Sequence, residues 1–97
     1  MVRLDAFLKN AGLFKSRSRA RRACDEGRVG IGGTPARGSR AVRVGEILEV
    51  EAGGHRLEVE VLDLPQRPVA RSQRSHYVRE LRREALPAEV LSFDDEP

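Results

Sequence analysis

The chain has few of the residues that build metal or redox sites. Cys24 is its single cysteine, so no disulfide can form within the chain, and a reducing compartment is expected. Its two histidines, His55 and His76, are together with Cys24 too few and too scattered to ligate zinc. Aromatic residues make up only 4% of the sequence, which leaves no exposed series for stacking on single-stranded bases. We expect no metal site, and any recognition of nucleic acid should depend on shape and phosphate contacts.

Long apolar runs are missing as well. No stretch approaches the ~20 apolar residues that a membrane-spanning helix needs. The first five residues include Arg3 and Asp5, where a signal peptide has an apolar run. The 97 residues suffice for one small domain, whose core is too limited for a deep substrate pocket. We therefore predict a cytoplasmic protein that is not an enzyme and has no catalytic residues and no cofactor.

Positive charge is concentrated in the first half of the chain. Residues 1–45 contain eleven Arg and Lys against three acids, a net charge of +8. Residues 46–97 contain seven Arg against twelve acids, a net charge of −5. A GC-rich genome would explain why arginine is used rather than lysine, but not why the charges are segregated. The asymmetry indicates a surface that binds a polyanion.

Two helices are predicted near the N-terminus. The first ends at Gly12 and is indicated by apolar residues at helical spacing, namely Leu4, Phe7, Leu8 and Ala11. The second covers about residues 16–26, with Ser16 as its N-cap and Gly27 just beyond its end. Its inner face consists of small residues, Ala20, Ala23 and Cys24, which let it lie close to the first helix.

Beyond Gly27 the hydrophobic pattern changes to a period of two, which predicts strands. We expect strands over residues 28–31, 47–51 and 57–64, with turns at the glycine pairs 32–33 and 53–54 and a loop over 34–43. Glutamates alternate with apolar residues in the last strand, so one face of the sheet should be solvated. The predicted fold class is α+β, with two N-terminal helices packed on a small, mostly antiparallel sheet.

Prolines at positions 65 and 68 break the chain after the last of these strands. A basic C-terminal helix is predicted over residues 72–85, because Val78, Leu81 and Ala85 align on one face. An acidic segment follows, which we expect to be disordered. The chain is accordingly divided into a sheet-containing domain (1–64), a linker with the C-terminal helix (65–86) and a flexible acidic tail (87–97).

The second predicted helix carries the densest group of arginines. Arg17 and Arg21 lie along one edge of its small-residue face, Arg22 nearly opposite and Arg19 on the other flank. Acids follow Arg21 and Arg22 at i+4 and should partly neutralise them, whereas Arg17 and Arg19 have no such acid. Lys15 and the free N–H groups of the helix N-terminus add positive potential, which predicts a phosphate-binding ridge. A charged helix face is often merely solvated, but five further arginines in the same half of the chain favour nucleic acid.

Several spaced motifs resemble the S4 RNA-binding domain and together cover residues 2–50. They are Arg3-Leu4-Asp5, Leu8, Lys15-Ser16-Arg17 with Ala20, Gly27-Arg28-Val29, Gly33 and Val44-Gly45-Glu46. The resemblance implies an L-shaped helical motif, with the strands that follow it, that docks on structured RNA. The chain departs from the family by having Gly32 where an asparagine is common and Gly38 where a proline is common. From the residues and the resemblance together, the predicted RNA-binding residues are Arg3, Lys15, Ser16, Arg17, Arg19, Arg21, Arg22, Arg28 and Arg37.

The order of elements along the whole chain is similar to two groups of short S4 proteins. These are the bacterial heat-shock protein fifteen group and the S4 proteins of ribosome-associated quality control. The similarity implies binding to a large ribosomal subunit that carries a stalled peptidyl-tRNA. Residues 67–83, with six arginines and one acid, either extend the RNA surface or form a packing helix with a solvated face.

We therefore predict a monomeric RNA-binding accessory factor with no membrane partner. Its partners would be structured rRNA or tRNA on the large subunit, and its role the rescue or recycling of stalled ribosomes. One alternative is a regulatory module that binds DNA or protein through the same basic helix. Another is the detached RNA-targeting domain of an RNA-modifying enzyme. Because Arg17 lacks an acid at i+4, Arg17→Ala is expected to weaken RNA binding more than Arg21→Ala does.

Overall fold

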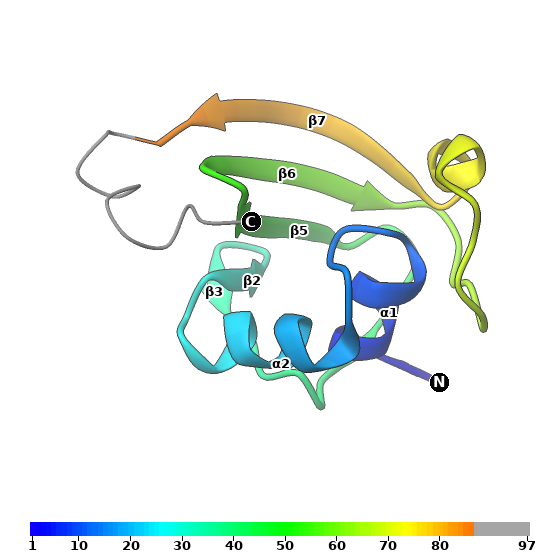
Figure 1. Cartoon of the computed structure of the whole chain (residues 1–97), viewed down its shortest axis with the longest axis horizontal. Coiled ribbons are helices and arrows are strands. Elements are labelled where there is room, and N and C mark those ends of the chain that lie inside the picture. The colour runs from blue at the N-terminus through cyan, green and yellow to red at the C-terminus, as the bar shows by residue number, and fades with distance from the viewer. Residues whose placement is uncertain (87–97) are drawn as a thin grey trace.

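The computed structural model describes residues 1–86, and these form helices packed against an antiparallel sheet (Figure 1). The helices are α1 (Leu4–Asn10) and α2 (Arg17–Asp25). The main sheet has the order β3-β2-β5-β6-β7, from β2 (Val29–Ile31), β3 (Thr34–Pro35), β5 (Ile47–Ala52), β6 (His55–Val61) and β7 (Val78–Ala85). Two short strands, β1 (Val2–Arg3) and β4 (Ala41–Val42), pair separately. The expected α+β class, with two N-terminal helices and a mostly antiparallel sheet, is confirmed.

The two helices pack against the sheet with side chains of different size, large on α1 and small on α2. Phe7 and Leu8 of α1 are fully buried, as are Leu48 and Val50 of β5. Burial of an aliphatic or aromatic side chain of this size stabilises the fold by about 1.5–3 kcal/mol. The inner face of α2 has only small residues, among them the fully buried Ala20. The backbone of α2 can therefore approach α1 closely, and its long side chains are left on the outside.

Both ends of α2 are capped as the sequence predicts. The Ser16 side chain accepts a hydrogen bond from the backbone N–H of Arg19, at 3.1 Å. At the other end, Gly27 has a φ of +76°, in the left-handed region that favours glycine. Its N–H donates to the Cys24 carbonyl, and the next N–H, of Arg28, donates to the Ala23 carbonyl. This pair of bonds is the Schellman motif, which satisfies two carbonyls at the helix end and fixes where the chain leaves α2.

The sheet has one buried and one solvated face, as expected. Val59 and Val61 of β6 are buried, and Glu58 and Glu60 between them are partly exposed. Glu58 lies opposite Glu49 of β5, so acidic side chains gather on the face turned away from the helices. The arginines of α2 thus lie on the helical side of the molecule, whereas on the far side of the sheet the glutamates of β5 and β6 lie beside Arg56, Arg79 and Arg82.

The C-terminal helix predicted over residues 72–85 is wrong. The chain forms a 3₁₀ helix, η1 (Arg71–His76), and then the strand β7, which pairs along the whole of β6. A helix would have buried only a three-residue stripe. Strand pairing instead satisfies the backbone groups along the edge of β6 and puts Val78 into the core. A register shift beside Glu58 and Val59 interrupts the alternation, so the sequence of β7 does not show the period of a strand.

The acidic tail predicted over residues 87–97 lies outside the described residues, and the domain boundary after residue 64 stays a prediction. Within residues 1–86, no helix is long and apolar enough to cross a membrane.

Candidate RNA-binding interface

The nine predicted RNA-binding residues come from β1, α2, the connections on either side of α2 and the loop between β3 and β4. Seven of them are exposed, and Ser16 and Arg28 are partly exposed. We refer to their basic members as the arginine surface: Arg3, Lys15, Arg17, Arg19, Arg21, Arg22, Arg28 and Arg37. Some of these cations share an acidic partner with a second arginine, and others do not.

The first cluster joins Arg3 to Arg17 through Asp5, the first-turn acid of α1. Arg3 Nη2 lies 3.0 Å from Asp5 Oδ2, and Arg17 Nε lies 3.3 Å from Asp5 Oδ1. Asp5 thus forms an ion pair with each of the two arginines. The expectation that Arg17 lacks an acid partner is wrong, because its acid lies twelve residues away in sequence, on the neighbouring helix. Only the packing of α1 against α2 brings these groups together.

The second cluster joins Arg22 to Arg28 through Glu26, at the C-terminal end of α2. Arg22 Nε lies 3.3 Å from Glu26 Oε2, at the expected i, i+4 spacing, and Arg28 Nη2 lies 2.9 Å from Glu26 Oε1. The predicted partial neutralisation of Arg22 is confirmed. The ion pair between Arg28 and Glu26 could not be predicted from helical spacing, because Arg28 lies beyond the end of α2. The Schellman turn brings it back to Glu26.

The other two arginines of α2 are Arg19 and Arg21. Among the described residues, neither Arg19 nor Arg21 has an acid within ion-pair distance, and both are exposed. The predicted pairing of Arg21 with Asp25 is therefore wrong. An exposed i, i+4 pair contributes only about 0.3–0.5 kcal/mol, so its spacing alone does not decide whether it forms.

The loop between β3 and β4 completes the arginine surface. Arg37 and Ala36 line a shallow cavity together with Cys24 and Asp25, which places Arg37 beside the C-terminal end of α2. Three residues on, Arg40 is held by Glu46, with Nη2 and Oε2 2.8 Å apart. The hydrogen bonds from Arg40 lower the pKa of the Glu46 carboxyl below its ordinary value.

Cys24 lies on the buried face of α2 and is not a reactive group. It is 5% exposed, and burial raises the pKa of its thiol to about 11, with smaller contributions from Asp5 and Asp25. The thiolate is therefore scarce at neutral pH. Cys24 serves as a small packing residue between α2 and the core.

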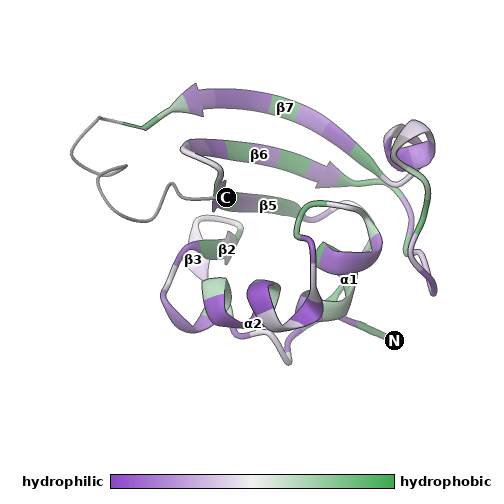
Figure 2. Cartoon of the chain, viewed as in Figure 1, coloured by the Kyte–Doolittle hydropathy of each residue, from purple (hydrophilic) through white to green (hydrophobic). Residues whose placement is uncertain are grey.

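The arginines of the C-terminal strand are balanced by acids. Arg82 pairs with Glu84 at 3.0 Å and Arg83 with Glu80 at 3.0 Å. The ribbon of β7 is mostly hydrophilic (Figure 2). Of the two interpretations of residues 67–83, the paired charges favour packing with a solvated face, although the packing element is a strand and not a helix.

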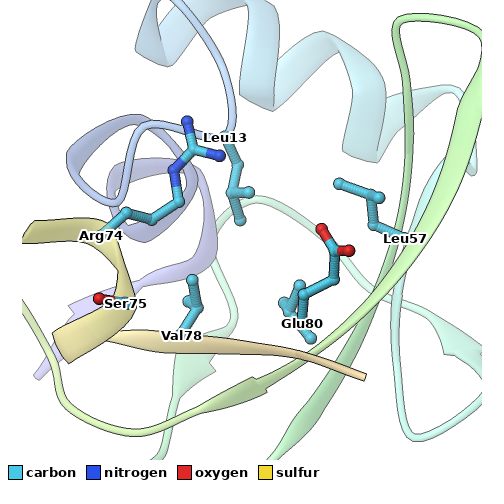
Figure 3. A pocket seen from close by; sticks show the side chains of 7 residues that line it. Leu13, Leu57, Arg74, Ser75, Val78 and Glu80 are labelled. Atoms are coloured by element: carbon cyan, nitrogen blue, oxygen red, sulfur yellow. The ribbon is translucent and has the colours of Figure 1, made fainter. Parts of the chain in front are cut away.

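A cavity of about 270 Å³ lies between the α1–α2 connection and the inner face of β6 and β7. Figure 3 shows Arg74 and Leu13 on one side of this cavity and Glu80 and Leu57 on the other. Arg74 Nη2 donates a hydrogen bond to the Gly12 carbonyl, at 2.8 Å. Arg74 thus ties η1 to the loop before α2. In the described part of the chain, no group of histidine, cysteine and acidic side chains has the geometry to hold a metal ion.

The arrangement is suited to binding phosphates. Guanidinium groups present planar forks of N–H donors that match phosphate oxygens. They are carried on a helix and its flanking turns, which the caps of α2 hold in place. Cations outnumber acids on this surface, and this excess of positive charge favours the approach of a polyanion from that side.

Comparison with known proteins places the chain in a family. The family model of the S4 domain matches residues 2–48. Among curated relatives, the "RQC P-site tRNA stabilizing factor" of Bacillus subtilis is 40% identical over 63 residues, 65% of this chain and 73% of the relative. The protein of the same name from Halalkalibacterium halodurans is 33% identical over 63 residues, 65% of this chain and 72% of the relative.

A solved structure supports the same assignment. The trimeric structure of Heat Shock Protein 15 from Vibrio cholerae matches with a TM-score of 0.78 at 26% identity, covering 81% of this chain and 80% of that one. The S4 motifs expected from the sequence, the helix pair with its following strands, and these relatives agree. The chain belongs to the S4 domain family.

Proposed function

We propose that this protein is a non-catalytic RNA-binding factor of ribosome-associated quality control, which binds tRNA and rRNA on a large ribosomal subunit with a stalled nascent chain. The observation that carries the proposal is the arginine surface, whose exposed cations lie on α2 and on the segments beside it. The relatives named as stabilizing factors for P-site tRNA support tRNA as a partner. We further propose that the protein is monomeric and cytoplasmic, where its ribosomal partners are found.

Binding would proceed through backbone phosphates of folded RNA. The exposed side chains on α2 reach outward from a helix whose N-terminus is capped by Ser16. Positively charged groups release counterions from the RNA when they bind, so affinity should fall steeply with salt. Few aromatic residues are available for base stacking, which favours recognition of RNA shape over recognition of a single-stranded sequence.

Competition for the labelled protein tests this proposal. Large subunits with peptidyl-tRNA in the P site, vacant large subunits, small subunits and duplex DNA would each be titrated at the same salt concentration. We expect the large subunit with peptidyl-tRNA to compete best, by at least about tenfold over small subunits. Equal competition by duplex DNA would instead support a regulatory module that binds polyanions without selectivity. Light scattering of the free protein distinguishes the proposed monomer from a trimer like that of the Vibrio relative.

A further inference from the structure

Asp5 is a buried acid that lies directly beneath the arginine surface. It is 1% exposed, and no other charged residue of the described chain is buried. Its carboxylate accepts hydrogen bonds from Arg3 Nη2 at 3.0 Å and Nε at 3.3 Å, from Arg17 Nε at 3.3 Å and from the Ala6 N–H at 2.7 Å. The two arginine side chains themselves remain 44% and 56% exposed. A single buried carboxylate thus holds two outward-facing cations.

The bonds to Asp5 leave specific donors available for an outside ligand. Arg17 is held through Nε, so neither of its Nη groups is engaged by Asp5. Arg3 is held through Nε and Nη2, which leaves Nη1. Because the guanidinium is planar, fixing one edge also fixes the direction of the remaining donors. The bonds to Asp5 therefore restrict the orientations of the remaining N–H groups of Arg3 and Arg17, and both guanidinium groups lie beside the same carboxylate.

The Asp5 carboxylate is itself immobilised by the loop between β3 and β4. The Asp5 N–H donates to the Gly38 carbonyl at 3.0 Å, and the Leu4 N–H donates to the Arg40 carbonyl at 2.8 Å. Gly38 is buried against the acid, and a Cβ at this position would lie 3.2 Å from Asp5 Oδ2. The loop leaves little room for the carboxylate to move. The side chain is therefore rigid enough to act as a template.

We propose that Asp5 is a positioning residue, which holds Arg3 and Arg17 as a preformed two-arginine site for one backbone phosphate of the bound RNA. This inference rests on the proposed RNA-binding function and deepens it. Arginine side chains lose much rotamer freedom when they bind, and Asp5 restricts that freedom before the RNA arrives. The net charge of the three groups is +1, so the site attracts a phosphate although it contains an acid.

Two effects of Asp5 on RNA binding have opposite signs, which makes the inference testable. Removing a negative charge about 7 Å from a phosphate would by itself tighten binding, by up to about threefold in water. Losing the positioning of two arginines would weaken binding by about tenfold, because their side chains must then be ordered by the RNA. Asp5→Asn, which removes the charge and keeps the shape, should therefore weaken binding.

The matched control is Asp25→Asn, an identical chemical change at an exposed position of α2. Affinity for a large-subunit RNA fragment would be measured at one salt concentration for both variants. We expect Asp5→Asn to bind about tenfold more weakly than wild type and Asp25→Asn to bind equally or slightly more tightly. Tighter binding by Asp5→Asn, matching the control, would overturn the inference.

A double-mutant cycle separates positioning from general structural damage. In a protein that already carries Arg3→Ala and Arg17→Ala, adding Asp5→Asn should cause no further loss of affinity. A further tenfold loss in that background would show that Asp5 acts through the fold and overturn the inference. Thermal unfolding of each variant, measured in parallel, gives the fraction folded.

A second pair of variants keeps the inference falsifiable if Asp5→Asn does not fold. Arg17→Lys keeps the charge, but a lysine ammonium lacks the planar group that lets arginine bond Asp5 through one nitrogen and a phosphate through the others. We therefore expect about tenfold weaker binding. Arg21→Lys, at a position with no acid partner within the described residues, should change affinity by less than about threefold. Equal losses would overturn positioning by Asp5. If wild type does not bind the RNA at all, the proposed function fails; if it binds and only these contrasts are missing, the inference about Asp5 alone fails.

Discussion

Replacing Glu26 by glutamine should tighten RNA binding, because this carboxylate occupies donors of two members of the arginine surface. Glu26 lies at the end of α2, with Arg22 Nε 3.3 Å from Oε2 and Arg28 Nη2 2.9 Å from Oε1. Its side chain is 46% exposed, so the two pairs are surface pairs. Glu26→Gln removes one negative charge and leaves both arginines and the helix end in place.

The size of the effect follows from Coulomb's law. A phosphate on the far side of a guanidinium lies about 7 Å from the carboxylate, and the repulsion there is about 0.6 kcal/mol in water. Salt screens this repulsion, with a Debye length of about 30 Å at 0.01 M and about 8 Å at 0.15 M ionic strength. With one phosphate at each arginine, we expect binding to tighten about fivefold at the lower salt concentration and about twofold at the higher.

Fluorescence anisotropy of a labelled large-subunit RNA fragment, at both salt concentrations, measures this change. The free energy of unfolding should change by less than about 1 kcal/mol, since exposed ion pairs contribute little and a carboxylate is unfavourable at a helix C-terminus. Unchanged affinity would show that Arg22 and Arg28 do not approach phosphates. Weaker binding would show that Glu26 positions its arginines, and would refute the assignment of that role to the buried Asp5 alone.

Three further predictions concern the fold that carries the arginine surface. Ser16→Ala should lower the free energy of unfolding by about 1 kcal/mol in urea titrations, because the N-cap of α2 is lost, whereas the neighbouring exposed Ser18→Ala should not destabilise the protein. Val78→Ala should cost about 2 kcal/mol and Leu81→Ala close to nothing, since Val78 is 6% exposed and Leu81 47%; comparable losses would favour a helix over this segment. Cys24, with a thiol pKa of about 11, should resist alkylation at pH 8 until denaturant unfolds the chain, and rapid labelling of the native protein would contradict its burial.

The N-terminal half of the fold could be predicted because its signals are local. Apolar spacing defined α1, and Ser16 and Gly27 marked the ends of α2 through bonds to neighbouring backbone groups. The strand β7 could not be predicted in the same way. Its residues are compatible with a helical stripe, and the deciding factor is the unpaired edge of β6, a tertiary feature.

In the candidate site, too, local contacts could be predicted and tertiary contacts could not. The i, i+4 rule identified the pair between Arg22 and Glu26, which lie on one helix. It missed the contact between Asp5 and Arg17, because that pair forms only when α1 packs against α2. The consequence is functional as well as structural. Arg17 is held by an acid, and Arg21 has no acid partner among residues 1–86, which is the reverse of what their positions in the sequence suggest.

We propose that the arginine surface binds RNA phosphates on the large ribosomal subunit. The most direct test of this proposal is the affinity for large subunits carrying peptidyl-tRNA, measured from about 0.05 to 0.2 M monovalent salt. If about five phosphates are neutralised, the plot of log affinity against log salt should have a slope of about −3.5 to −4.5, a loss of about two orders of magnitude over this range. A slope near zero would contradict the account.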